Sequence, residues 1–269
     1  MSRENHDCEM AFAFLPAGRG IDSSFSHSLT NSLGAAYIIA YLRQHGFSAE
    51  QVVSKRSLNI TDCARIILER KPSVVGLTVY VTNYEASVLL AKAIKRVAPH
   101  VLVVFGGPTP SVQANNILQN IEEVDICVHN EGEDICLALL TKLKSADFCL
   151  DSNILARIDG ISYRNDDRTI VTNPDASVFV ANRHIKDYLD KFPSPYLSGI
   201  LPVTNNAGVL TARGCNQNCT YCNCAVLSSR SILTHSVDRV IDELEYISQA
   251  GMSPNEEIQI FDDAFTHHF

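Results

Sequence analysis

The chain has 269 residues, 46% of them hydrophobic, and a formal net charge of −8. This length exceeds one typical domain and supplies enough apolar residues for the core of one large or two medium domains. The acidic balance, without any block of clustered Lys and Arg, argues against a nucleic-acid backbone as partner, because neutralising phosphates requires clustered positive charge.

Nothing in the sequence indicates a membrane protein or a secreted one. No stretch approaches the roughly 20 uninterrupted apolar residues of a membrane helix, and the opening MSRENHDCEM is too polar for a secretory signal. We therefore expect a cytosolic protein whose nine cysteines are mostly reduced. Five of these are most simply interpreted as small buried hydrophobic side chains or surface thiols: Cys8, Cys63, Cys127, Cys136 and Cys149.

The first 145 residues alternate short apolar runs with longer amphipathic segments, a pattern typical of a parallel sheet with intervening helices. Strands are predicted at 10–16, 50–54, 73–80, 100–107 and 124–130. Clear helical patterns end at Gly46, before Pro72 and before Pro99, which are ordinary stop signals. This order predicts a flavodoxin-like doubly wound sheet, a fold that binds ligands beyond the carboxyl ends of its strands.

The alternation of apolar runs and amphipathic segments ends after residue 145. Residues 158–174, IDGISYRNDDRTIVTNP, predict a β-hairpin, and the proline-rich 191–202 predicts an extended connector. From about 207 a new cycle begins, with a strand, a cysteine-rich loop, a helix at 236–250 and a strand at 257–263. Because the sequence stops at Phe269, we expect this second α/β unit to be a fragment or to pack on something else.

Four cysteines lie within ten residues of the loop, in the order C-x3-C-x2-C-x-C: Cys215, Cys219, Cys222 and Cys224. Thiolates suit iron and zinc, so a zinc site, an iron–sulfur cluster and reactive thiols are the alternatives. Zinc ribbons usually separate two C-x2-C pairs by a longer interval, which counts against zinc. Three cysteines on a four-iron cluster would leave one iron open to a small molecule.

The segment CNQNCTYC resembles the C-x3-C-x-aromatic-C motif of the radical S-adenosylmethionine (radical SAM) superfamily, and the flanking LTARGC and IQIFDDAF resemble the strands around it. The resemblance implies that Cys215, Cys219 and Cys222 hold a [4Fe-4S] cluster whose open iron binds SAM. It places Tyr221 against the adenine and Asp263 near the methionyl group. Cys224 falls outside the motif, and we expect it to pack beneath the loop.

Three segments at successive strand ends, VVGLTVYVTN, VVFGGPTPS and VHNEGED, resemble the cobalamin (B12)-binding domain found ahead of many radical SAM domains. Paired glycines allow a ligand to approach the backbone closely. The implied cobalamin-binding residues are Thr78, Val79, Tyr80, Gly106, Gly107, Pro108, Glu131, Gly132 and Glu133.

Histidines do not complete the resemblance. Classical cobalamin domains carry D-x-H-x-x-G after the first strand, and His27 does not complete that motif, so no histidine is expected beneath the cobalt. His267 and His268 are expected to be part of a polar terminus rather than metal ligands.

The resemblance covers nearly the whole chain and implies its organisation. A cobalamin-binding, Rossmann-like domain is expected at 8–145, a linker with a hairpin at 146–205, and the first β/α units of a radical SAM partial TIM barrel at 206–269.

The implied function is that of a cobalamin-dependent radical SAM enzyme. It would transfer a methyl group to an unactivated carbon or phosphorus through a 5′-deoxyadenosyl radical and methylcobalamin. A cyclase or rearrangement enzyme, and a truncated cobalamin-binding fragment without activity, are the alternatives. A flavodoxin or ferredoxin is the expected electron donor. The substrate, small molecule or peptide, is left open because fold likeness does not define it.

Overall fold

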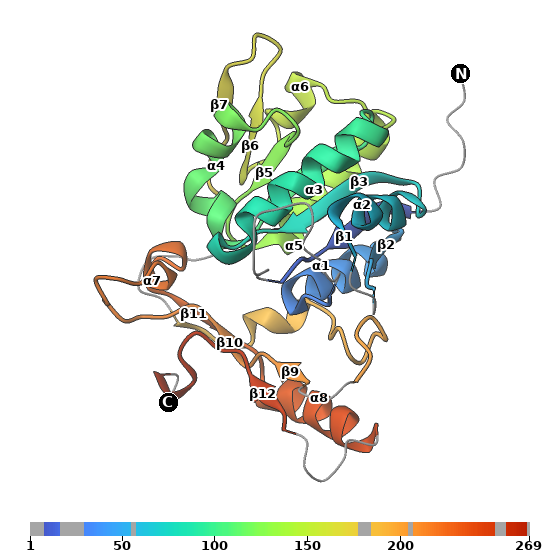
Figure 1. Cartoon of the computed structure of the whole chain (residues 1–269). Coiled ribbons are helices and arrows are strands. Elements are labelled where there is room, and N and C mark those ends of the chain that lie inside the picture. Colours follow the sequence, from blue (N-terminus) through green and yellow to red (C-terminus); the bar gives the residue numbers. More distant parts are fainter. Residues whose placement is uncertain are drawn as a thin grey trace. The chain divides into compact units, whose positions relative to one another are not determined.

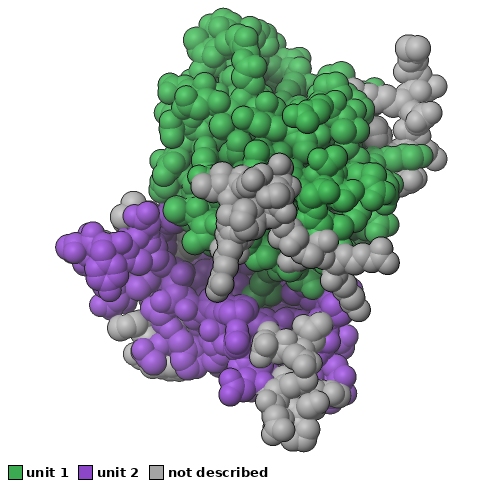
Figure 2. Space-filling model, viewed as in Figure 1, with its two compact units in different colours: residues 1–176 green, residues 177–269 purple. Residues whose placement is uncertain are grey.

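A computed structural model describes residues 8–16, 30–54, 58–176, 184–203, 207–250 and 257–267. The chain forms two compact units, residues 1–176 and residues 177–269 (Figures 1 and 2). Across the described ranges, no helix is both long and apolar enough to span a membrane.

The first unit is built on a seven-stranded sheet with the strand order β2-β1-β3-β4-β5-β6-β7 (Figure 1). Its five parallel strands are β1 (Cys8–Ala13), β2 (Ala49–Gln51), β3 (Pro72–Thr78), β4 (Leu102–Gly106) and β5 (Ile126–Val128). The order of these five is that of flavodoxin, so the predicted doubly wound sheet is confirmed. The strand order reverses between β1 and β3, and such a reversal opens a crevice at the carboxyl edge of the sheet.

The predicted hairpin forms, as β6 (Ile161–Arg164) and β7 (Ile170–Thr172). It extends the sheet instead of standing apart as a linker, because β6 pairs antiparallel with β5 and covers its open edge. The Arg164 guanidinium reinforces this junction by donating hydrogen bonds to the carbonyls of Leu118 (2.7 Å), Glu122 (2.8 Å) and Val124. The hairpin therefore belongs to the first unit.

Helices cover both faces of this sheet. They are α1 (Leu33–Gln44), α2 (Ile60–Leu68), η1 (Val81–Asn83), α3 (Tyr84–Val97), α4 (Pro108–Asn120), α5 (Gly132–Ser145) and the short α6 (Ser152–Leu155). Helices α2, α3 and α4 share one hydrophobic core with β1, β3 and β4, whereas α1 and α5 pack against each other and cover the opposite face. Side-chain caps begin three of them, since Ser32 accepts from the Ala35 amide, Asn59 from the Asp62 amide and Asp151 from the Asn153 amide.

The five cysteines outside the loop are free thiols, as expected. Cys8, Cys63, Cys127 and Cys136 are buried, and Cys149 lies at the surface. Burial raises the pKa of Cys63 to about 11 and that of Cys127 to about 12, so these thiols stay protonated at neutral pH. They act as small apolar side chains in the first unit.

The second unit contains two small sheets. One has the order β10-β11-β8, formed by β10 (Ala212–Arg213), β11 (Ile232–Thr234) and β8 (His184–Ile185). The other pairs β9 (Gly208–Val209) with β12 (Gln259–Ile260) in parallel. The helical pieces are η2 (Tyr188–Lys191), α7 (Cys224–Leu227), α8 (Val237–Gln249) and η3 (Phe265–His267). The expected strand, helix and strand are therefore present as β9, α8 and β12, the start of a β/α repeat.

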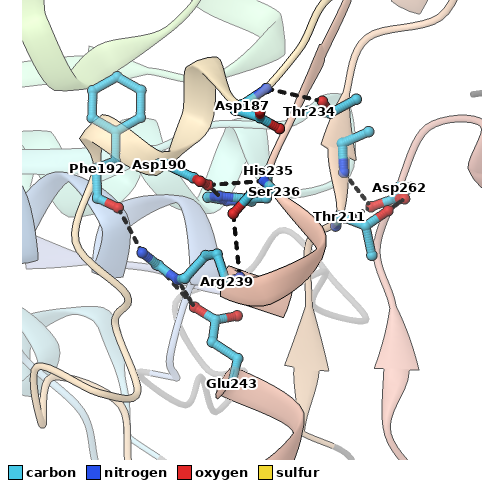
Figure 3. Close-up of polar contacts among 11 residues, drawn as sticks. Asp187, Asp190, Phe192, Thr211, Thr234, His235, Ser236, Arg239, Glu243 and Asp262 are labelled. Atoms are coloured by element: carbon cyan, nitrogen blue, oxygen red, sulfur yellow. Dashed lines mark hydrogen bonds and ion pairs between the residues drawn. The ribbon is translucent and has the colours of Figure 1, made fainter. Parts of the chain in front are cut away.

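Polar contacts hold the end of η2 to the start of α8 (Figure 3). The Asp190 carboxylate accepts hydrogen bonds from His235 Nδ1 (2.9 Å) and from the Ser236 amide (3.1 Å), at the electropositive start of the helix. One turn later, Arg239 forms an ion pair with Glu243 (3.1 Å), whose side chain is 2% exposed. The 3-10 helix η2, which precedes the proline-rich segment, is thus fixed to α8.

The buried His235 makes the stability of the second unit depend on pH. Burial lowers its pKa to about 4, whereas an unfolded histidine titrates near 6.5. Between these two pH values His235 is protonated in the unfolded chain and neutral in the folded chain. The free energy of unfolding therefore falls as the pH drops from about 6.5 towards 4, by up to about 3 kcal/mol. The pKa of Asp190 is also lowered, because hydrogen bonds from Ser236 and His235 outweigh its burial, and its contribution is lost in the same direction.

We predict that His235→Asn weakens this acid dependence, since asparagine binds no proton in this range. Calorimetric unfolding at pH 8, 6.5 and 5, with hydrogen exchange at the α8 amides to identify the unit, measures the effect. The variant should be less stable than the wild type at pH 8 and lose less stability on acidification. Equal loss in both proteins would show that carboxylates elsewhere cause the acid dependence.

Candidate functional site

The loops that carry the predicted cobalamin residues meet at the carboxyl edge of the first sheet. Beyond the last pair of the β3–β4 ladder, the Val79 amide donates to the Gly106 carbonyl (2.8 Å). The Thr109 amide in turn donates to the Val79 carbonyl (3.3 Å). The structure therefore brings Thr78–Tyr80 and Gly106–Pro108 together, as the sequence predicts for neighbouring parallel strands.

Only glycine fits at position 107. Its φ is +99°, and a Cβ there would lie 3.0 Å from the Val79 carbonyl oxygen. Gly106 differs, because its φ lies outside the left-handed region and a Cβ there would meet no atom of the described residues within 4 Å. Open space therefore borders the Gly106 backbone, which is what a closely approaching ligand needs.

The N-terminus of α4 is not built to bind an anion through its backbone. Two of its first four residues, Pro108 and Pro110, lack an amide hydrogen. The amides of Thr109 and Ser111 are already bonded to the carbonyls of Val79 and Gly107. The Thr109 hydroxyl is buried and has no hydrogen-bond partner within the described part of the chain. The loop therefore fits a ligand that packs on peptide backbone better than a bare phosphate.

Asn83 ties the loop after β1 to the loop after β3, a role that sequence reasoning missed. Its buried side chain donates to the carbonyls of Leu15 (2.7 Å) and Thr78 (3.0 Å) and accepts from the Tyr80 amide (2.7 Å). The Tyr80 ring, 44% exposed, packs edge-on against Phe14. The only signal in the sequence was an asparagine directly before a helix.

The third predicted loop lies at the start of α5. Glu131 is the residue before the helix and is partly exposed. A Cβ on Gly132 would lie 2.7 Å from the Ile38 side chain of α1, and Glu133 is 2% exposed. Glu131 and Gly132 are therefore partly exposed, whereas Glu133 is buried.

The cysteine loop joins β10 to α7. Cys215 and Cys222 are partly buried and Cys219 is exposed. The Cys222 amide donates to the Cys219 carbonyl (3.2 Å), which turns the chain between them. Tyr221 is 89% exposed, so its ring is free to cover a bound molecule.

Two adjacent carboxylates hold the segment that leads into this loop. Asp262 accepts from the amides of Thr211 (2.7 Å) and Ala212 (3.1 Å) and from the Thr211 hydroxyl (Figure 3). Asp263 accepts from the Gly214 amide (2.9 Å) and is hydrogen-bonded to the Cys224 thiol. Burial and the Asp263 charge raise the pKa of that thiol. Asp262 and Asp263 can both bond to residues 211–214 because β12 ends at Ile260, before these two residues. Within a strand, adjacent side chains would point to opposite faces.

In the described part of the chain, potential metal ligands do not gather around one point. Among the residues whose placement is described, no three His, Cys, Asp or Glu side chains converge on one point. Zinc requires such convergence, since each sulfur lies about 2.3 Å from the ion. The cysteines of an iron–sulfur cluster bind different irons and need not converge. Cys215, Cys219 and Cys222 are soft thiol donors, so the chemistry of this donor set fits an iron–sulfur cluster.

Two histidine expectations have no structural outcome. His27 and His268 lie outside the described residues, as does the side chain of His267.

Known proteins match the chain in both units. Residues 26–140 match the family model of the B12 binding domain. The chain is 28% identical over 243 residues to "Uncharacterized methyltransferase PH0819" of Pyrococcus horikoshii, an alignment that covers 87% of this chain and 49% of the relative. It is 28% identical over 189 residues to "Cobalamin-dependent radical SAM methyltransferase TokK" of Streptomyces tokunonensis, covering 66% of this chain and 26% of the relative.

A solved structure shares the fold. OxsB, a cobalamin-dependent S-adenosylmethionine radical enzyme solved with aqua-cobalamin and S-adenosylmethionine bound, superposes with a TM-score of 0.68 at 18% identity. The superposition covers 95% of this chain and 34% of OxsB. The chain thus spans about half of one curated relative and a quarter to a third of the other two proteins. Residues 26–140 thus match the B12-binding domain family, and the chain is similar in sequence to a cobalamin-dependent radical SAM methyltransferase and in fold to OxsB.

Proposed function

We propose that this chain is part of a cobalamin-dependent radical SAM enzyme that transfers a methyl group to an unactivated carbon or phosphorus centre. The observation that carries the proposal is the combination of two features in one chain: a C-x3-C-x2-C loop beside β10, and a B12-binding sheet with open space at Gly106. The names of two relatives, both methyltransferases, support methyl transfer.

In the second unit, Cys215, Cys219 and Cys222 would ligate three irons of a [4Fe-4S] cluster and leave the fourth for SAM. The bound cluster would supply the electron that cleaves SAM, and bound cobalamin would supply the methyl group. Tyr221, exposed at the end of the loop, would stack on the adenine. Asp263 would act on SAM indirectly, because it holds the Gly214 amide ahead of the first cysteine.

In the first unit, the backbone of Thr78–Tyr80 and of Gly106–Pro108 would line the nucleotide tail of cobalamin, with Glu131 beside it. Because the N–H groups of the first turn of α4 are used internally, recognition would depend on close packing against Gly106. The free thiols suit a reducing, cytosolic location, and a flavodoxin or ferredoxin would be the electron donor.

The cobalamin site is tested by Gly106→Ala. The added methyl group meets no atom of the described residues within 4 Å, so the fold should keep its melting temperature within about 2 °C. If a ligand packs there, its affinity should fall about tenfold, the usual effect of an overpacked contact. Equilibrium dialysis with hydroxocobalamin measures the affinity.

Gly107→Ala is the contrasting variant, because its methyl group strains the backbone beside Val79. It should lower both the melting temperature and the affinity. If the wild type binds cobalamin and Gly106→Ala binds it with the same affinity, Gly106 is not part of the site.

The cluster assignment is tested by Cys222→Ala, with Cys224→Ala and the surface variant Cys149→Ala as controls. After anaerobic reconstitution with iron and sulfide, the wild type and both controls should bind about four irons and absorb near 400 nm, whereas Cys222→Ala should bind almost none. All four proteins should retain cobalamin, because the cysteines lie in the other unit. Loss of iron in Cys224→Ala would argue for a four-cysteine site, and loss of cobalamin in Cys222→Ala would contradict the division of the two cofactors between units.

A further inference from the structure

One hydroxyl group connects the two loops that the cobalamin proposal relies on. Ser111, in the first turn of α4, donates from Oγ to the Gly107 carbonyl (2.9 Å). The same Oγ accepts from the Asn130 amide (2.9 Å) in the loop before α5. The backbone after β4 and the backbone after β5 are thus joined through a single side chain.

Both of these partners have unusual backbone conformations. Gly107 has a φ of +99° and Asn130 a φ of +53°. A residue other than glycine in the left-handed region persists only when its surroundings hold it there. Asn130 is held at two points, since its side chain also donates to Asp175 (2.9 Å). Ser111 therefore bonds to each loop at the residue where the chain turns.

His129 supports Ser111 from behind. Its Nδ1 faces the Ser111 carbonyl (3.4 Å), and its Nε2 lies 2.8 Å from the hydroxyl of Ser162, which is fully buried in β6. Burial lowers the pKa of His129, so the ring carries one N–H at neutral pH. A carbonyl only accepts, which assigns that hydrogen to Nδ1 and leaves Nε2 to accept from Ser162.

The hairpin completes this support. Because the Ser162 hydroxyl donates to His129, Ser162 Oγ accepts from the Thr172 hydroxyl (2.8 Å), and Thr172 Oγ1 lies 3.3 Å from Asn115 Oδ1 of α4. β6 and β7 thereby contact the first turns of α4 through polar side chains in addition to completing the sheet.

We propose that Ser111, supported by His129, is a positioning residue that sets the loops 106–108 and 130–133 at the spacing required by the nucleotide tail of cobalamin. This inference rests on the proposed cobalamin site. It assigns to the hairpin a part in cofactor binding, and it identifies two residues that touch neither cobalt nor substrate.

The simpler explanation is that Ser111 only anchors α4. The structure provides a separate anchor for the helix, because Arg164 donates to the carbonyls of Leu118 and Glu122 at the opposite end. Arg164→Met therefore serves as a matched control: it removes hydrogen bonds from the same helix and the same hairpin, at the edge of the sheet away from the loops.

The experiment measures the affinity of the full chain for hydroxocobalamin and for cobinamide, which lacks the nucleotide tail. Ser111→Ala removes two hydrogen bonds and should weaken hydroxocobalamin binding about tenfold, while cobinamide binding changes less than about twofold. Ser111→Thr keeps the hydroxyl and should bind hydroxocobalamin within about twofold of the wild type. Arg164→Met should lower the melting temperature and leave both affinities within about twofold.

Ser111 and His129 should affect hydroxocobalamin binding through the same contacts, so their effects should not add. His129→Phe removes both ring hydrogen bonds, and the double variant with Ser111→Ala should bind hydroxocobalamin no more weakly than Ser111→Ala alone. Additive losses would overturn the coupling between His129 and Ser111.

Further outcomes would overturn the proposal itself. If Ser111→Ala binds hydroxocobalamin like the wild type, or loses hydroxocobalamin and cobinamide equally, Ser111 does not set the loops for the tail. If Arg164→Met matches its loss of affinity, Ser111 is only a helix anchor. A wild type that binds no cobalamin would instead remove the proposed cofactor site.

Discussion

The carboxyl edge of the first sheet, where the candidate cobalamin-binding loops meet (the cobalamin edge), depends on one backbone hydrogen bond, from the Val79 amide to the Gly106 carbonyl. It continues the parallel ladder of β3 and β4 by one residue and draws the two loops together. At that separation the next residue has no room for a Cβ and must take a positive φ, so position 107 is a glycine. The chain then enters α4 with Pro108 and Pro110, which have no amide hydrogen, and the backbone N–H groups of Thr109 and Ser111 are both bonded.

Local sequence patterns predicted the helices and strands, which depend on the residues within each segment. Five apolar runs and the stops at Gly46, Pro72 and Pro99 indicated β1 to β5 and the helices between them, and their order followed from the doubly wound pattern. The hairpin at 158–174 was visible from its turn residues, but its place was not. Whether two strands stand alone or cover the open edge of β5 depends on tertiary pairing, which no local signal encodes.

The same limit applies to the candidate sites. Motif spacing identified Cys215, Cys219 and Cys222, and paired glycines identified the loop after β4. Asn83, Ser111 and His129 were missed because each acts on residues brought close only by folding, as when Asn83 bonds to Leu15, 68 positions away. The joint action of Asp262 and Asp263 was missed because the strand was expected to continue to residue 263, and β12 stops at Ile260.

The two units hold their loops by different means. At the cobalamin edge, the side chains of Asn83 and Ser111 hydrogen-bond directly to the loop backbone, which is therefore fixed without a ligand. Around the cysteines, the bonds concentrate at the ends of the loop. Asp262 and Asp263 hold residues 211–214, and Ser228 bonds to the Cys215 backbone, while Cys219 and Tyr221 are exposed. A cluster would add its own iron–sulfur bonds to such a loop, so the protein would need to fix only the ends. A cobalamin tail held by packing would instead require its surroundings to be in place beforehand.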